Sequence, residues 1–199
     1  DEFLGPIPGS YSNANTLSGI TDEVPATVSI GFSFPFYGQS YSSVLVSDNG
    51  VFLFGTSTGP SDVNSSLSSG SPPGVFGYWD DLNPVASGST NVIRTGVGGS
   101  APNRYFVASW VSVVHYYSAA GGSISFQIVL HEDGTIEIQY IDTLFASASY
   151  NYGASATVGI RGASDYAQVS YNSAAIVSPY AISFYPPVSD ADGDGYDPP

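Results

Sequence analysis

The chain has 199 residues, of which 42% are hydrophobic and 14% aromatic, which is enough to build a packed core and too aromatic for a disordered chain. Three arginines and no lysine stand against 17 acidic residues, and the resulting net charge of -14 excludes nucleic acids and anionic lipids as partners. The lack of cysteine excludes disulfide and thiol chemistry, and no apolar run is long enough to span a membrane.

The polar content comes mainly from Ser, Thr, Asn, Gly and Tyr, since only 10% of the residues are charged. This composition is typical of secreted surface proteins. The sequence contains no methionine, even at its first position, which indicates processing and removal of a signal peptide. We therefore expect an extracellular protein, secreted or attached to a cell surface. Its acidity suits either solubility in a salty medium or the binding of divalent cations.

Residues 1–10 (DEFLGPIPGS) are predicted to form an extended N-terminal arm. Phe3, Leu4 and Ile7 are its apolar side chains, and they would anchor the arm to the open sheet edge of a neighbouring molecule. Pro6 and Pro8 would restrict backbone pairing to part of the arm.

The first long predicted strand covers residues 27–34, and a hairpin follows in SSVLVSDNGVFLFG. Asn49-Gly50 supplies the tight turn of this hairpin. We expect its apolar residues, together with alternate rings of the preceding aromatic run, to face the core. The hairpin residues are Val44, Val46, Phe52 and Phe54, and the aromatic run contains Phe32, Phe34, Phe36, Tyr37 and Tyr41. The remaining rings of the run would lie at the edge of the core, where exposed tyrosines could stack on sugars.

Residues 56–74 form a long loop rich in Ser, Gly and Pro, and loops of this length are usually functional or mobile. Within it, Asn64-Ser65-Ser66 matches the acceptor pattern for N-linked glycosylation, a triplet that also arises often by chance. Asp80 ends the predicted strand 75–80, and Asp81 follows it. They would bind a cation, accept backbone N–H groups at a turn, or pair with Arg104.

The second half of the chain contains the strongest strand signals. After a short strand at 91–95, RYFVASWVSVVHYY reads as a long strand buried on both faces over part of its length. SISFQIVLHEDGTIEIQY then predicts a hairpin around Asp133-Gly134, with one face in the core and the other in water. Further strands are expected at 155–161, 167–171 and 180–185.

These elements predict an all-β fold: a two-sheet, antiparallel, jelly-roll-like β-sandwich of ten or eleven strands over residues 11–185. Residues 186–199 (PPVSDADGDGYDPP) form a Pro/Asp-rich linker after it. In this linker Asp190, Asp192 and Asp194 occupy positions 1, 3 and 5 of a calcium-binding loop, and Tyr196 and Asp197 would add oxygen ligands. Position 12 of such a loop would lie beyond the last residue, so the site is incomplete unless another segment completes it. A solvated acidic linker is the alternative to this calcium site.

The tail resembles the calcium repeats of thrombospondin type 3 proteins. The body carries an ordered series, FSFPFYGQSYSSVLVSDNGVFLFG, GVFGYWDDLNP, PNRYFVASWVSVVHY and ISFQIVLHEDGTIEIQY. Over roughly residues 28–185 this series resembles the nidogen-type extracellular domain of secreted and surface-anchored proteins. The resemblance implies a module for adhesion, matrix contact or assembly that has no catalytic centre.

The residues themselves also argue against an enzyme. The sequence lacks the G-x-S-x-G turn of serine hydrolases, the H-E-x-x-H zinc motif and a glycine-rich phosphate loop. Its two histidines, His115 and His131, lie at strand ends. We therefore predict a non-catalytic structural or adhesive subunit of a filament or surface layer, which associates with itself or with other extracellular proteins through strand or edge contacts. A carbohydrate- or matrix-binding module that contacts glycans, and an accessory domain of a larger secreted protein, are the alternatives.

Overall fold

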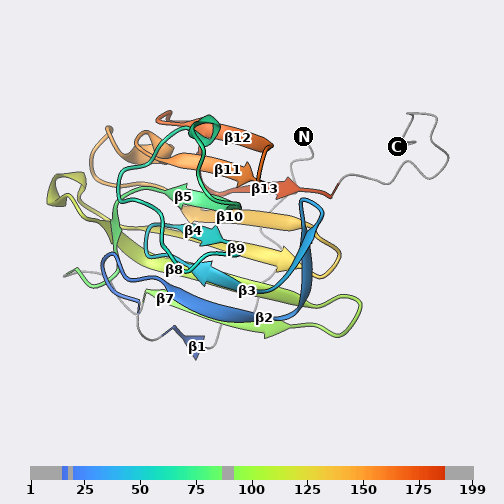
Figure 1. The fold of residues 1–199 in the computed structure, drawn as a ribbon. Coiled ribbons are helices and arrows are strands. Elements are labelled where there is room, and N and C mark those ends of the chain that lie inside the picture. The colour runs from blue at the N-terminus through green and yellow to red at the C-terminus, as the bar shows by residue number, and fades with distance from the viewer. Residues whose placement is uncertain (1–14, 18–19, 87–91, 187–199) are drawn as a thin grey trace.

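The computed structural model describes residues 15–17, 20–86 and 92–186 and places them in two antiparallel sheets that pack face to face (Figure 1). The first sheet contains β1 (Asn15–Thr16), β6 (Leu82–Asn83), β7 (Ile93–Gly98), β8 (Tyr105–His115), β9 (Ile124–His131), β10 (Ile136–Asp142) and β13 (Tyr180–Phe184). The second contains β2 (Ala26–Phe36), β3 (Gln39–Val46), β4 (Val51–Leu53), β5 (Gly74–Trp79), β11 (Thr157–Arg161) and β12 (Tyr166–Tyr171). Three 3-10 turns, η1 (Leu67–Ser69), η2 (Ser118–Ala120) and η3 (Asn151–Gly153), lie in connecting segments. None of the helices in these ranges has the length and apolarity needed to cross a membrane.

Strands that follow one another in the chain mostly lie side by side. The first sheet has the order β1-β7-β8-β9-β10-β13, with β6 paired to β8, and the second has the order β12-β11-β5-β4-β3-β2. Each sheet therefore contains a meander of four consecutive strands. The predicted all-β, two-sheet antiparallel sandwich is confirmed, and the strands beyond the predicted ten or eleven are the two-residue β1 and β6.

Both predicted hairpin turns are present. Gly134, in the turn between β9 and β10, has a φ of 95°, and the His131 N–H donates to the Thr135 carbonyl at 2.9 Å to close the turn. Gly50, in the turn between β3 and β4, has a φ of 74°, and the Ser47 N–H donates to the Val51 carbonyl at 2.9 Å. In both turns glycine supplies the left-handed backbone that other residues adopt only with strain.

The core lies between the sheets and is rich in aromatic rings. Trp110 on β8 stacks on Phe126 of β9 with ring centroids 4.8 Å apart, and it meets Phe52 of the opposite sheet at 5.9 Å. Burying one such side chain stabilises the fold by roughly 1.5–3 kcal/mol. The predicted inward residues Val44, Val46, Phe52 and Phe54 all belong to this core, as do Phe32, Phe34 and Phe36. Tyr37 is 44% exposed and Tyr41 lies partly buried against the core, so these two rings lie at its edge.

The outward face of the β9–β10 hairpin is not in water, contrary to the sequence prediction. Gln127 and Gln139 point away from the core but are only 6% and 0% exposed. A chain of hydrogen bonds crosses the strands here: Ser109 Oγ donates to Gln127 Oε1, Gln127 Nε2 to Gln139 Oε1, and Gln139 Nε2 to Glu137 Oε2. Polar side chains can be buried when they satisfy one another, so alternation predicted their polarity but not their burial.

The 56–74 loop packs over the outer face of the second sheet. Leu67 from the loop joins a second apolar cluster, whose other members are Leu45, Val51, Leu53, Phe76 and Trp79. The backbone of the loop is also held: Gln168 Oε1 accepts the Leu67 N–H at 2.8 Å, and Arg161 donates to the carbonyls of Leu67 and Ser71. The segment predicted to be functional or mobile is therefore part of the packed structure.

Candidate functional site

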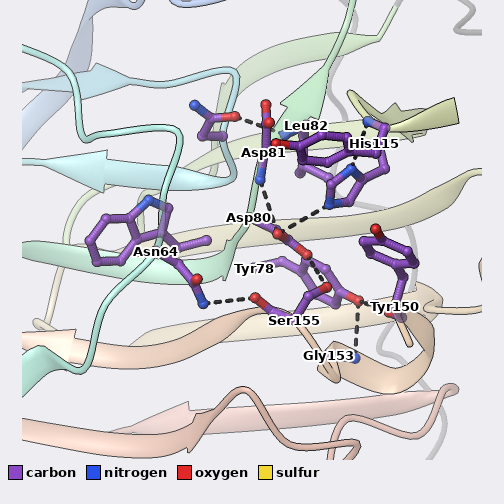
Figure 2. Close-up of polar contacts among 12 residues, drawn as sticks. Asn64, Tyr78, Asp80, Asp81, Leu82, His115, Tyr150, Gly153 and Ser155 are labelled. Carbon is purple, nitrogen blue, oxygen red and sulfur yellow. Dashed lines mark hydrogen bonds and ion pairs between the residues drawn. The ribbon is translucent and has the colours of Figure 1, made fainter. Parts of the chain in front are cut away.

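Asp80 is the centre of a buried polar cluster, whose contacts Figure 2 shows. Every residue of β5 is buried, and Asp80 follows directly with 5% of its surface exposed. Its Oδ1 accepts the Asp81 N–H at 3.1 Å and lies 3.2 Å from His115 Nε2. Its Oδ2 accepts the hydroxyl of Ser155 at 2.6 Å. This carboxylate therefore links β5 to the end of β8 and to the segment before β11.

The protonation of His115 follows from its two contacts. Nδ1 accepts the Tyr117 N–H at 3.0 Å, so the ring proton sits on Nε2 and is donated to Asp80. The ring is 4% exposed and packs at 4.6 Å against the ring of Tyr150 and at 5.8 Å against Phe145. His115 is thus a buried side chain at the last position of β8, with both ring nitrogens engaged in hydrogen bonds.

Tyr78 joins the next segment to the same cluster. Its hydroxyl donates to the Tyr150 carbonyl and accepts the Gly153 N–H, both at 3.0 Å (Figure 2). Burial, and next the negative charge of Asp80, raise the pKa of Tyr78 well above its ordinary value. The hydroxyl therefore stays protonated and fastens η3 to β5.

The chemistry of the cluster differs from that of a catalytic triad. In a triad the imidazole takes the proton of the serine hydroxyl. Here the Ser155 hydroxyl and the His115 imidazole both donate to Asp80, and Nδ1 of the imidazole is occupied by a backbone N–H. Neither arrangement activates a nucleophile. The contacts instead bring three distant segments together.

Asp81 has a different environment from Asp80, although the sequence treats them as one candidate pair. Its carboxylate is partly buried and lies in a group with Asp22 and Glu23, in which one oxygen from each residue is within 4.8 Å of the others. Burial raises the pKa of the Asp81 carboxyl to about 6; His115 acts in the opposite direction, and the carboxylates of Asp62, Glu23 and Asp22 add to the rise. The alternative pairing with Arg104 is not formed, because that guanidinium binds Glu132.

The turn between β3 and β4 frames this group of carboxylates. Asp48 Oδ2 accepts the Glu23 N–H at 2.9 Å. Asn49 reaches in both directions: its Nδ2 donates to Glu23 Oε1 at 3.3 Å, and its Oδ1 accepts the Leu82 N–H at 2.8 Å. Asp48 and Asn49 are each 1% exposed. The sequence predicted a hairpin turn here, but not its contacts with Glu23 and Leu82.

Asn64, the predicted glycosylation acceptor, is engaged inside the fold. Its Nδ2, the atom to which a glycan would be attached, shares its two N–H groups among three acceptors: the Ser155 carbonyl at 2.8 Å, Thr157 Oγ1 at 3.0 Å and Asn172 Oδ1 at 2.9 Å. These bonds fasten the 56–74 loop to β11 and to the segment after β12. Glycosylation here stays a prediction, and it would require all three bonds to be given up.

A pocket of about 280 Å³ lies between the 56–74 loop and the second sheet. The hydroxyl-bearing Ser61, Ser65, Ser69 and Ser71 line it, and Phe76 and Trp79 form its apolar part. Trp79 is 4% exposed and Phe76 0%, and the indole N–H donates to the Ser61 carbonyl at 2.8 Å. The pocket therefore offers hydroxyls and backbone rather than an open aromatic face.

Two groups of predicted site residues lie outside the described residues. They are the arm residues Phe3, Leu4 and Ile7, and the calcium-loop residues Asp190, Asp192, Asp194, Tyr196 and Asp197. The hypotheses built on them stay predictions. Asp22, Glu23 and Asp48 were not predicted as site residues, because each lies far from Asp81 in the chain and none belongs to a recognisable motif.

The match to known proteins comes from one family model. It is described as NIDO related, that is, related to the nidogen domain, and it matches residues 6–189. No curated protein and no solved structure matches the chain significantly. The match covers nearly the whole chain, including every strand of both sheets. The chain therefore belongs to the NIDO-related family, which indicates a module of extracellular type.

Proposed function

We propose that this chain is a non-catalytic, extracellular structural or adhesive module that associates with further copies of itself through the edges of its sheets. Membership of a nidogen-related family supports the extracellular part of the proposal. The saturated hydrogen bonds around Asp80 support the absence of catalysis, because they leave neither an activated hydroxyl nor a free imidazole there. The observation that carries the self-association is the character of β12.

β12 is an edge strand with an unusually apolar surface. It pairs only with β11 among the described strands, and five of its six residues are exposed. Three of these are large: Tyr166 is 47% exposed, Val169 42% and Tyr171 41%, and the strand carries no charge. Natural edge strands usually carry charges or prolines that prevent pairing with another chain. An edge without them fits a surface that is covered in an assembly.

The register of β12 limits how a partner can pair with it. Val158 pairs with Ser170 and Gly159 with Gln168, so Val169 is an extra residue that forms a β-bulge. A bulge twists the strand and interrupts regular pairing. A short apolar segment suits such an edge better than a long regular strand does, and Phe3, Leu4 and Ile7 of another copy provide one. In the same assemblies, calcium bound by the motif of the tail would bridge the negatively charged copies.

The test is the mass and shape of the full chain in solution, measured by light scattering and electron microscopy. Val169→Lys places a charge on the β12 edge, and the triple change of Phe3, Leu4 and Ile7 to Ser removes the apolar arm. Both variants are expected to be monomeric while the wild type associates. Val85→Lys is the matched control, because Val85 is 59% exposed and lies outside both sheets. A monomeric wild type, or a Val169→Lys variant that associates as the wild type does, would contradict the proposal.

A second candidate function, glycan binding, has one observation in its favour. Tyr116 and Tyr117 follow β8 and are 55% and 57% exposed, with ring centroids 5.7 Å apart. Exposed aromatic faces stack on sugar rings through apolar contact. A glycan array checks this: reproducible binding to one sugar class should be lost when both tyrosines become Ala. Tyr185→Ala is the control, since Tyr185 is 60% exposed elsewhere on the surface.

A further inference from the structure

The outward face of the first sheet is buried, although it points away from the core. Val107 and Val129 lie opposite each other on β8 and β9, and both are 0% exposed. The residues on either side of each valine belong to the core cluster, whereas the two valines belong to neither apolar cluster, so they point outward. Gln127 and Gln139 continue the same buried face. A single copy of the chain therefore hides this face from water.

None of the described elements accounts for this burial. The second sheet packs against the inner face of the first, and the 56–74 loop lies over the second sheet. η1 contacts β11 and β12, Ala120 of η2 belongs to the core, and Tyr78 fastens η3 to β5. The cover therefore comes from outside the described ranges, and the two longest segments there are residues 1–14 and 187–199.

Position and length allow the N-terminal segment to cover this face. β1 pairs with β7 at the edge of the first sheet, with Asn15 opposite Thr95, so residues 1–14 precede a strand of this same sheet. An extended chain spans about 3.3 Å per residue, so these residues reach about 46 Å. Four spacings of about 4.8 Å separate β7 from β13, which is about 19 Å. The segment is long enough to cross the whole sheet.

The chemistry of the two segments favours the N-terminal one. Residues 3–14 carry no charge, and the three apolar side chains of the arm suit a face whose centre is a pair of valines. The two prolines of the arm have no N–H, so they leave no backbone donor unsatisfied on an apolar surface. Residues 187–199 contain four aspartates. Burying these beside Glu137, which accepts a hydrogen bond on this face, is unfavourable.

We propose that the N-terminal arm of each chain docks on the outward face of its own first sheet, with its apolar side chains over Val107 and Val129. This inference goes beyond the proposed function and does not rest on it. Docking uses the same side chains that would reach β12 of another copy. A docked arm must therefore be released before copies associate through it, so docking and assembly compete.

The chain contains no cysteine, so a single cysteine in the full chain reports the accessibility of one position. Val129→Cys lies beneath the proposed arm, and Val169→Cys lies on the exposed β12 edge. At a concentration where light scattering shows monomers, a maleimide should label Val129→Cys at least about tenfold more slowly than Val169→Cys. Changing Phe3, Leu4 and Ile7 to Ser in the same chains should remove this difference by raising the Val129→Cys rate alone.

Several outcomes overturn the proposal. One is equally fast labelling of Val129→Cys and Val169→Cys in the full chain, and another is a Val129→Cys rate that the arm variant leaves unchanged. A rate that rises instead when Val188 and Tyr196 become Ser would make the tail the cover. Protection of Val129→Cys that disappears on dilution would assign the cover to another copy.

A second probe and a second readout complete the test. Val107→Cys repeats the measurement on β8 if Val129→Cys does not fold, as circular dichroism checks, and the same rate changes are expected there. A chain that stays monomeric at every concentration, with its cysteine at position 129 or 107 protected by the arm, supports docking and contradicts the assembly proposal alone.

Discussion

Asp80 accepts hydrogen bonds from the Asp81 N–H, from His115 and from Ser155 while 95% of its surface is hidden from water. Replacing it with Ala leaves the imidazole and hydroxyl protons buried without an acceptor. Removing the acceptor of such buried donors lowers the free energy of unfolding by about 3 kcal/mol. We expect Asp80→Ala to lower the free energy of unfolding by about this amount, as urea denaturation would measure. Asp165→Ala, at an exposed carboxylate, should change it by less than about 0.5 kcal/mol, and equal effects of the two changes would contradict the structural role.

Asp48 makes the stability depend on pH. Burial raises the pKa of its carboxyl from 3.8 to about 6, although hydrogen bonds from Glu23 and Ser47 act in the opposite direction. Between about pH 4 and pH 6 the folded chain therefore holds more protons than the unfolded chain, and the free energy of unfolding falls as the pH rises through this window. The loss reaches about 3 kcal/mol when Asp48 is fully ionised.

The matched variant for this prediction is Asp48→Asn, which cannot ionise. Urea denaturation in chelator at several pH values should show a flatter decline for the variant than for the wild type. The variant retains a second contribution of the same sign, since the pKa of Asp81 is also raised to about 6. Identical slopes for the two proteins would show that Asp48 does not titrate in this range.

At the scale of single elements, the turn between β3 and β4 depends on a close approach of backbones. Gly50 has a φ of 74°, and a Cβ atom there would lie 2.3 Å from the Tyr78 carbonyl oxygen. Gly38, in the turn between β2 and β3, has a φ of 76° but nothing within 4 Å of the same position. Both residues have a positive φ, so the two positions differ only in the space available for a Cβ atom.

The two glycines therefore give a matched pair of substitutions. Gly38→Ala should destabilise the protein by about 1 kcal/mol, the penalty for the left-handed conformation alone. Gly50→Ala should cost about 2 kcal/mol more, because the strands must move apart to accommodate the methyl group. Thermal or urea denaturation of both variants measures the difference. Similar losses would mean that the contact between Gly50 and β5 is easily relaxed.

These turns also show how far the sequence predicts the elements. Asp133-Gly134 and Asn49-Gly50 are local signals, and the structure contains a turn at each. The alternation around Phe126 and Ile128 predicted their inward face correctly. The burial of Gln127 and Gln139 could not be predicted, because it depends on Ser109 of a different strand. Local pattern specifies the strands, and contacts between strands decide which polar side chains are hidden.

The same limit applies to the candidate sites at the scale of the whole molecule. Asp80 and Asp81 were predicted from the sequence as a single pair. In the structure Asp80 is hydrogen-bonded to His115, whereas Asp81 lies close to Asp22 and Glu23. His115 lies 35 residues from Asp80 in the chain, and Asp22 and Glu23 lie still farther from Asp81. A single sequence gives no spacing rule for such contacts, because the folding of both sheets creates them.

The net charge of the whole chain, -14, opposes any association of copies. Raising the ionic strength from about 0.01 M to about 0.1 M shortens the screening length from about 30 Å to about 10 Å. We therefore expect the mass measured by light scattering to increase with sodium chloride in the presence of chelator, since screening weakens the repulsion while the uncharged β12 edge is unaffected. Val169→Lys should remain monomeric at every salt concentration, although the added lysine makes the chain less negative. A mass that falls as salt is added would show that opposite charges, rather than an apolar edge, hold the copies together. A mass that responds to calcium and not to sodium chloride at equal ionic strength would show that bound ions bridge them.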